Sequence, residues 1–107
     1  MGPDCRPAQT ADNIHFHLRG VRQDVIVNGV TITDPIGGHW VWPCNSFNWW
    51  LAPVNQVGDE LDLFAKPHRH ASAGTEYQVI VTYADGTRAR GSVIGTDVVP
   101  WSVVSKR

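Results

Sequence analysis

Apolar and polar residues alternate along much of this chain, which is the pattern of half-buried β-strands. In residues 13–19 (NIHFHLR), the apolar residues Ile14, Phe16 and Leu18 occupy every second position, so they share one side of an extended strand. Short runs rich in β-branched and aromatic residues, separated by Pro and Gly, recur at 39–42, 48–51 and 60–65. No window has the helical period of about 3.6 residues, so the pattern predicts an all-β fold.

Two pairs of residues that end in Gly predict hairpin turns, Asn28-Gly29 and Asp85-Gly86. In the second hairpin, a two-residue loop would place Arg90 opposite Val81 on the apolar side. A three-residue loop that begins at Ala84 instead gathers the apolar residues on one side. We therefore predict the three-residue loop, with Gly86 left-handed and with the facing pairs Tyr83–Thr87, Val81–Ala89, Val79–Gly91 and Tyr77–Val93.

The spacing of strands and turns predicts one domain. The chain has 107 residues, enough for a single small core. Short strands separated by turns at intervals of roughly ten residues are typical of an antiparallel sandwich or barrel. We expect a β-sandwich of about seven short strands over residues 12–101, with an N-terminal arm at 1–11 and a C-terminal tail at 102–107.

Charge and composition narrow the classes of partner. Nine basic and ten acidic residues give a formal net charge of −1, without the basic excess typical of nucleic-acid-binding domains. The uncharged stretch 36–58 contains Pro43 and Pro53, so no membrane span is expected. Residues 1–11 lack the apolar run of a signal peptide. The cellular location stays undecided, although a bridge between Cys5 and Cys44 would indicate an extracellular or particle-associated protein.

Residues 39–50 (HWVWPCNSFNWW) contain four of the five tryptophans. Trp40 and Trp42 share one side of a strand, whereas the adjacent Trp49 and Trp50 point to opposite sides. Core packing and a partly exposed binding surface are both open, and nearby Asn side chains would supply hydrogen bonds beside exposed rings. The candidate surface for a carbohydrate or protein partner comprises Trp40, Trp42, Asn45, Asn48, Trp49 and Trp50.

Residues 71–83 (ASAGTEYQVIVTY) resemble the corner and late strand of immunoglobulin-like sandwiches. The resemblance implies that Tyr77 is the corner tyrosine and that Trp49 or Trp50 is the core tryptophan. Val79 stands where antibody-type domains have a cysteine, so the resemblance is to the wider superfamily. It implies a fold and does not transfer a function.

Residues 67–86 (PHRHASAGTEYQVIVTYADG) are similar to the first motif of the cupins, which are metal-binding jelly rolls. This resemblance implies that His68, His70 and Glu76 bind one divalent transition metal, for which two imidazoles and a carboxylate are suitable ligands. Five residues separate His70 from Glu76, one or two more than in the family, and no later His supplies the second motif. The alternative prediction is therefore a small cupin-like jelly roll that binds metal, with enzymatic activity left open.

Other polar residues favour a solvated surface over catalysis. His15 and His17 lie on the polar side of their strand, where solvent exposure accounts for them, although a His-x-His pair on a strand aims both rings the same way and suits a metal. Asp59, Glu60 and Asp62 are interpreted as a turn and a solvated strand face. No Gly-x-Ser-x-Gly nucleophile motif is present. We expect a non-catalytic binding or assembly module that needs no cofactor, with a homo-oligomer or a larger assembly as one form.

Overall fold

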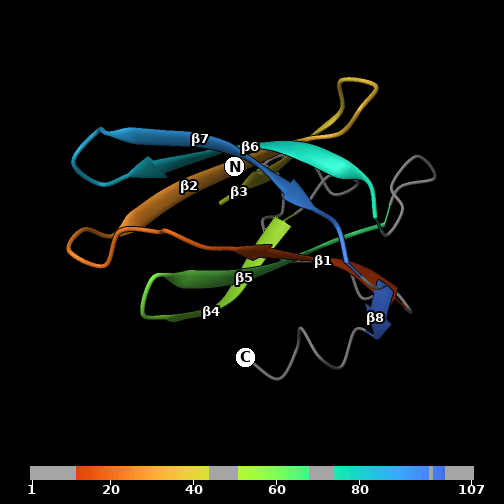
Figure 1. The fold of residues 1–107 in the computed structure, drawn as a ribbon, viewed down its shortest axis with the longest axis horizontal. Coiled ribbons are helices and arrows are strands. Elements are labelled where there is room, and N and C mark those ends of the chain that lie inside the picture. Colours follow the sequence, from red (N-terminus) through yellow and green to blue (C-terminus); the bar gives the residue numbers. More distant parts are fainter. Residues whose placement is uncertain (1–11, 44–50, 68–73, 97, 101–107) are drawn as a thin grey trace, which may run out of the picture.

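The computed structural model describes residues 12–43, 51–67, 74–96 and 98–100, and in these the chain forms two four-stranded antiparallel sheets (Figure 1). Residues 44–50 and 68–73 lie outside the described parts. The first sheet has the order β4 (Leu51–Val57), β5 (Glu60–Ala65), β1 (Asp12–Leu18) and β8 (Val98–Pro100). The second sheet has the order β3 (His39–Trp42), β2 (Val27–Thr33), β6 (Glu76–Tyr83) and β7 (Arg88–Ile94).

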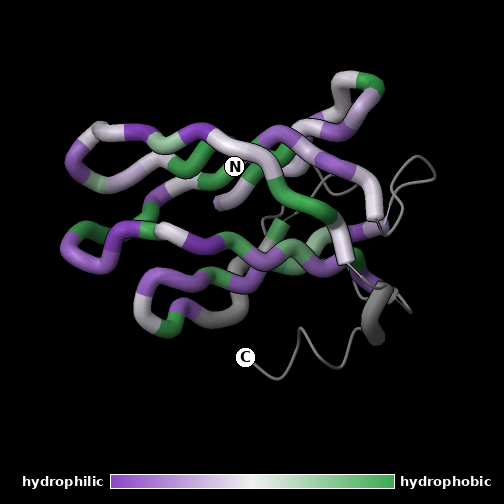
Figure 2. The backbone as a smooth tube through the Cα atoms, viewed as in Figure 1, coloured by the Kyte–Doolittle hydropathy of each residue, from purple (hydrophilic) through white to green (hydrophobic). Residues whose placement is uncertain are grey.

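The predicted all-β sandwich is confirmed, with eight strands in the described residues where about seven were expected. Hydrophobic and hydrophilic residues alternate along the strands (Figure 2). That alternation places every second side chain between the sheets, as a two-layer architecture requires. No helix in the described chain is long and apolar enough to cross a lipid bilayer.

The β6–β7 hairpin has the predicted loop and register. Val81 pairs with Ala89, and Tyr77 pairs with Val93. The Tyr83 N–H donates to the Thr87 carbonyl over 2.9 Å, and Gly86 has a φ of 88°. A positive φ at the last loop position is characteristic of three-residue hairpin loops.

The predicted turn at Asn28-Gly29 is wrong, because both residues lie inside β2. The register between β2 and β6 shifts between Val27 and Gly29, which marks a β-bulge. The turn between β2 and β3 follows instead at Asp34, whose Oδ1 accepts the N–H groups of Ile36 over 3.1 Å and Gly38 over 2.7 Å. A Gly inside a strand pattern can indicate a bulge as well as a turn.

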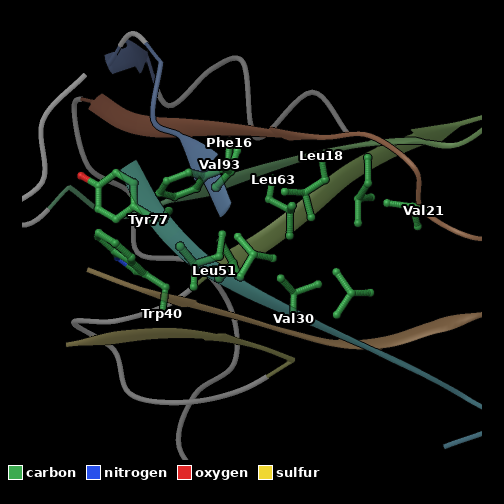
Figure 3. Packing of buried hydrophobic residues seen from close by; sticks show 14 of the residues in the cluster. Phe16, Leu18, Val21, Val30, Trp40, Leu51, Leu63, Tyr77 and Val93 are labelled. Atoms are coloured by element: carbon green, nitrogen blue, oxygen red, sulfur yellow. The ribbon is translucent and has the colours of Figure 1, made fainter. Parts of the chain in front are cut away.

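The core between the sheets is organised around three aromatic rings (Figure 3). Phe16 lies 5.6 Å from Trp40 and 5.2 Å from Tyr77, centroid to centroid, and Trp40 lies 5.6 Å from Tyr77. The Trp40 indole N–H donates to the Lys66 carbonyl over 2.9 Å. Trp40 is 0 % exposed, so its expected place in a binding surface is wrong: this indole fills the core instead.

Among the described strands, none closes the side of the sandwich between β1 and β7. β8 pairs only with Asp12–Ile14, at the start of β1, and β7 is the outer strand of the second sheet. The chain crosses from β7 toward β8 beside β1, where the Thr96 N–H donates to the His15 carbonyl over 3.0 Å. Beyond this crossing, no described strand joins the end of β1 to β7.

Candidate functional site

Two histidines and an aspartate meet on the outer face of the first sheet. Because Phe16 and Leu18 point into the core, the intervening His17 and the neighbouring His15 point outward. His17 pairs with Asp62 across the β1–β5 ladder. One nitrogen of each imidazole and one oxygen of Asp62 lie within 4.8 Å of one another.

Each imidazole in this cluster has one inner and one outer partner. The inner nitrogens are His15 Nε2 and His17 Nδ1, which lie 2.8 Å and 2.6 Å from Asp62 Oδ1. The outer nitrogens are His15 Nδ1, 2.9 Å from Thr96 Oγ1, and His17 Nε2, 2.6 Å from Glu60 Oε1. Both rings are therefore held at both nitrogens, which fixes their orientation.

Packing adds to this positioning. The His15 ring stacks on Phe64, with centroids 4.7 Å apart and an interplanar angle of 18°. Phe64 is itself only 5 % exposed. The aromatic surface beneath His15 thus limits the tilt of its ring.

Two members of the cluster, His17 and Asp62, are stabilised in their charged forms. The hydrogen bond to Asp62 raises the pKa of His17 against an opposing effect of partial burial, and Glu60 raises it further. Partial burial acts to raise the pKa of Asp62, but the hydrogen bonds from His17 and His15 lower it overall. The Asp62 carboxylate is therefore ionised, and a cation that binds here would displace a proton from His17.

A groove of about 380 Å³ opens between β1 and β7. Its apolar lining comes from core-facing residues of both sheets: Leu18, Val21, Val79, Val81 and Val93. Although Ala89 and Gly91 of β7 face inward, they are exposed. A Cβ atom added at Gly91 would meet nothing within 4 Å, so the space above this residue is open.

Backbone groups line the groove as well. Since Tyr83 and Thr87 bond directly across the hairpin, the ladder alternates from there, and Arg88, Arg90, Ser92 and Ile94 turn their N–H and C=O groups away from β6. Among the described residues, no strand pairs with that edge. β7 therefore offers a free set of donors and acceptors beside an apolar cavity.

Positive charge surrounds the opening. Arg19 and Arg90 line the opening and are exposed, and Arg88 is exposed two positions before Arg90 on β7. No described carboxylate forms an ion pair with Arg88 or Arg90, and Arg19 has only a long contact of 3.8 Å with Glu60. An anionic group at the rim would meet these guanidinium groups directly.

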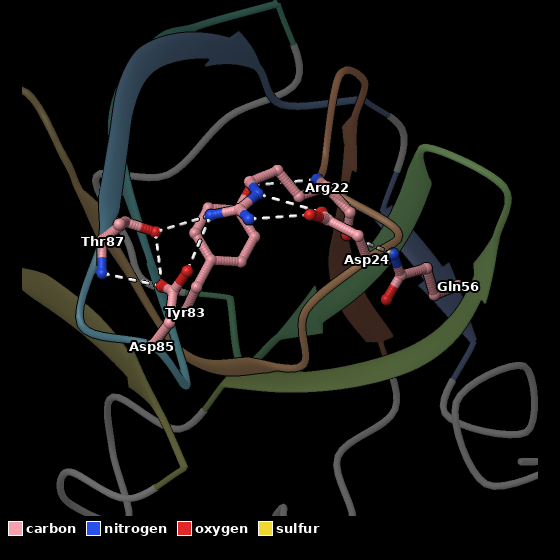
Figure 4. A network of polar contacts seen from close by, with 6 residues as sticks. All are labelled: Arg22, Asp24, Gln56, Tyr83, Asp85 and Thr87. Atoms are coloured by element: carbon pink, nitrogen blue, oxygen red, sulfur yellow. Dashed lines mark hydrogen bonds and ion pairs between the residues drawn. The ribbon is translucent and has the colours of Figure 1, made fainter.

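A cluster of contacts around Arg22, called the arginine clamp here, lies beside Tyr83, which also lines the groove (Figure 4). Arg22 donates to Asp24 over 2.8 and 3.0 Å, to Asp85 over 3.0 Å and to Thr87 Oγ1 over 2.9 Å. Its backbone N–H donates to the Tyr83 hydroxyl over 3.1 Å, and its guanidinium lies 5.4 Å from the ring centroid. These contacts fasten the segment after β1 to the β6–β7 loop.

Most of the sequence-predicted site residues are not brought together in the described parts of the chain. Trp42 is half-buried and packs against the core, and Glu76 is exposed at the start of β6, opposite Ile94. The remaining candidates lie outside the described residues: Asn45, Asn48, Trp49, Trp50, His68 and His70. Cys5 and Cys44 lie outside them too, so the predicted surface, the cupin-like site and the disulfide stay predictions.

The sequence predicts Glu60 and Asp62 to be solvated acids, whereas the structure places them in contact with the two histidines. Glu60 and Asp62 are two positions apart on their strand, as His15 and His17 are on theirs. Each pair therefore shares one face of its strand, and this spacing is the signal for the cluster that the sequence offers. Only the pairing of β1 with β5 brings the two polar faces together.

Comparisons of the chain with protein-family models, with curated proteins and with solved structures found no match.

Proposed function

We propose that this protein is a non-catalytic binding module that holds an extended segment of a partner protein in the groove between β1 and β7. The observation that carries this proposal is the open edge of β7 beside an apolar cavity. A bound strand would take up the free backbone groups of β7 and place every second side chain over Leu18 and Val81. Strand addition of this kind combines main-chain affinity with side-chain specificity.

The charge at the rim indicates the chemistry of the partner. Arg19, Arg88 and Arg90 would face the outward side chains of a bound strand, and Arg88 and Arg90 form no ion pair with a described carboxylate. A segment that alternates apolar with acidic residues therefore complements the groove best. Charge complementarity of this kind favours one class of partner and rejects segments of like charge.

The immunoglobulin-like plan is also a proposal, and the strand order supports it. If β1 to β7 are read as strands B, C, C′, D, E, F and G, the sheets have the orders D-E-B and C′-C-F-G. β8 then lies beside strand B, where the first strand of such domains lies. The groove corresponds to the remaining part of that position, which a partner strand would fill.

A carbohydrate-binding surface with Asn45, Asn48, Trp49 and Trp50 stays an alternative prediction, as does a cupin-like metal site with His68 and His70. No described contact favours either one.

The proposal is tested by selecting displayed random peptides of about eight residues, a usual strand length, on the intact protein. We expect the enriched peptides to alternate apolar residues with Asp or Glu. Gly91→Val, which fills the groove, should weaken their binding about tenfold or more. The control variant Gln78→Val places a β-branched side chain on the outer face of β6, outside the groove lining, and should bind normally.

Three results would overturn the proposal: no enriched peptides, enriched peptides without the alternating acidic pattern, or equal binding by the two variants. Light scattering and a chain that lacks residues 1–11 test the other occupants of the groove. A dimer that Gly91→Val dissociates would assign the groove to a second copy, and peptide binding that appears only without residues 1–11 would assign it to this arm.

A further inference from the structure

The His15, His17 and Asp62 side chains form a compact set of two nitrogen donors and one oxygen donor on the outer face of the first sheet. We infer that this set binds one divalent transition metal ion, with His15 Nε2, His17 Nδ1 and a carboxylate oxygen of Asp62 as the ligands. One of the ligands, His17, also belongs to the groove lining, whereas the cupin-like residues His68 and His70 are not part of this set.

The direction of the donors supports this inference. The inner nitrogens of both rings converge on the same carboxylate, at 2.8 and 2.6 Å from Asp62 Oδ1. They come from neighbouring outward positions of one strand, and the carboxylate comes from the paired position on the next. A sheet holds such residues in place through its backbone ladder, so few rotamers need to be fixed when an ion binds.

The outer nitrogens provide a second, independent observation. Metal-binding histidines usually have a partner at the other ring nitrogen, which fixes the tautomer and orients the ring. Here Thr96 Oγ1 lies 2.9 Å from His15 Nδ1, and Glu60 Oε1 lies 2.6 Å from His17 Nε2. In a metal site the inner nitrogens bind the ion and the partners of the outer nitrogens orient the rings, and the cluster has both features.

The ligand set indicates the class of ion. Two imidazoles and a carboxylate suit Zn²⁺ and neighbouring first-row metals, whereas Mg²⁺ and Ca²⁺ prefer oxygen ligands alone. The side chains of His15, His17 and Asp62 are 24 %, 31 % and 37 % exposed. Solvent or a partner group can therefore complete the coordination of an ion held by three protein ligands.

The test measures binding of Zn²⁺ to the metal-free full-length protein by calorimetry, with Mg²⁺ as the control ion. We expect one equivalent of Zn²⁺ and no response to Mg²⁺. His15→Gln, His17→Gln and Asp62→Asn should each weaken binding about tenfold or more. His39→Gln, which changes an exposed histidine that lies 2.9 Å from Thr33 Oγ1, should bind normally.

Thr96→Val and Glu60→Gln test the outer partners and should weaken binding about tenfold each, the lower end of the usual range for such groups. Far-ultraviolet circular dichroism of every variant checks that the sheet persists. The optical spectrum of bound Co²⁺, which reports nitrogen and oxygen ligation, gives a readout for the direct ligands besides affinity.

Absence of stoichiometric Zn²⁺, or binding that His15→Gln and His17→Gln leave unchanged, would overturn the inference. If His68→Gln and His70→Gln abolish binding instead, the metal belongs to the cupin-like residues. Because Gly91 is no part of this cluster, Gly91→Val should retain Zn²⁺, so the groove and the metal site can fail separately.

Discussion

Trp40 and Trp42 show how two similar residues two positions apart acquire different surroundings. Both lie on one side of β3, as their spacing predicts. Trp40 is completely buried against Phe16 and Tyr77, while Trp42 is half-buried at the margin of the core. The sequence pattern therefore established which residues share a face, but the depth of each depended on what the opposite sheet placed over it.

The histidine cluster likewise combines a local sequence pattern with a contact between distant parts of the chain. The alternation in residues 13–19 was sufficient to turn His15 and His17 outward. It gave no information on Asp62, which is 47 residues away from His15 along the chain. A contact of that separation depends on the register of two strands, and local periodicity does not determine register.

Asp85 gives a prediction about pH at the residue scale. Hydrogen bonds from the Thr87 hydroxyl and backbone N–H, together with Arg22, lower the pKa of Asp85 from 3.8 to about 2. A carboxyl with a lowered pKa in the folded state stabilises the protein above its unfolded pKa, and this contribution is lost as the pH falls toward the folded value. The melting-temperature difference between wild type and Asp85→Asn should therefore be constant above about pH 5 and shrink between pH 3.8 and 2.

Melting curves followed by circular dichroism over this pH range measure that difference. In an Arg22→Gln background, the effect of Asp85→Asn should become smaller, because the ion pair of 3.0 Å is absent. A melting-temperature difference that does not change with pH would contradict the role of the Asp85 charge in the clamp.

At the scale of elements, the two Gly-containing pairs of the sequence had different outcomes. The β6–β7 loop was predicted correctly because the facing of nearby residues alone selects its length. Asn28-Gly29 has the same local chemistry, yet its neighbours continue as one strand that pairs with both β3 and β6. Long-range pairing overrode the turn signal there.

Substitution by Ala should separate these two glycines. Gly86 has a φ of 88°, which an L-residue adopts at a cost of about 1–2 kcal/mol. Gly29 does not have a positive φ, and an added Cβ would lie 3.5 Å from the Trp42 carbonyl oxygen, an ordinary contact. Urea denaturation should show that Gly86→Ala lowers the free energy of unfolding by about 1–2 kcal/mol and that Gly29→Ala lowers it less. A larger loss of stability for Gly29→Ala than for Gly86→Ala would contradict the bulge assigned to β2.

At the scale of the whole molecule, the sequence predicted the class of fold, and the pairing of distant strands created the two candidate sites. The histidine cluster depends on β1 lying beside β5, and the groove depends on β1 lying near β7 in the opposite sheet. The small inward-facing residues of β7, Ala89 and Gly91, were visible in the sequence. The groove itself could not be predicted from these two residues, because its other wall is formed by β1.

Gly91 links this architecture to stability and gives the last prediction. A Gly inside a strand costs about 0.5–1 kcal/mol relative to Ala, and its missing side chain leaves Val79 and Val81 beside an unfilled groove. Because an added Cβ meets nothing within 4 Å, Gly91→Val should fit without strain and raise the free energy of unfolding by about 1 kcal/mol. Gln78→Val adds a β-branched side chain on the outer face of β6, outside the groove lining, and should raise it less. Urea denaturation of both variants measures this, and a Gly91→Val protein less stable than wild type would contradict an open groove. A stabilised variant that no longer binds peptides would indicate that the chain retains Gly91 for binding at the expense of stability, a trade-off common at functional sites.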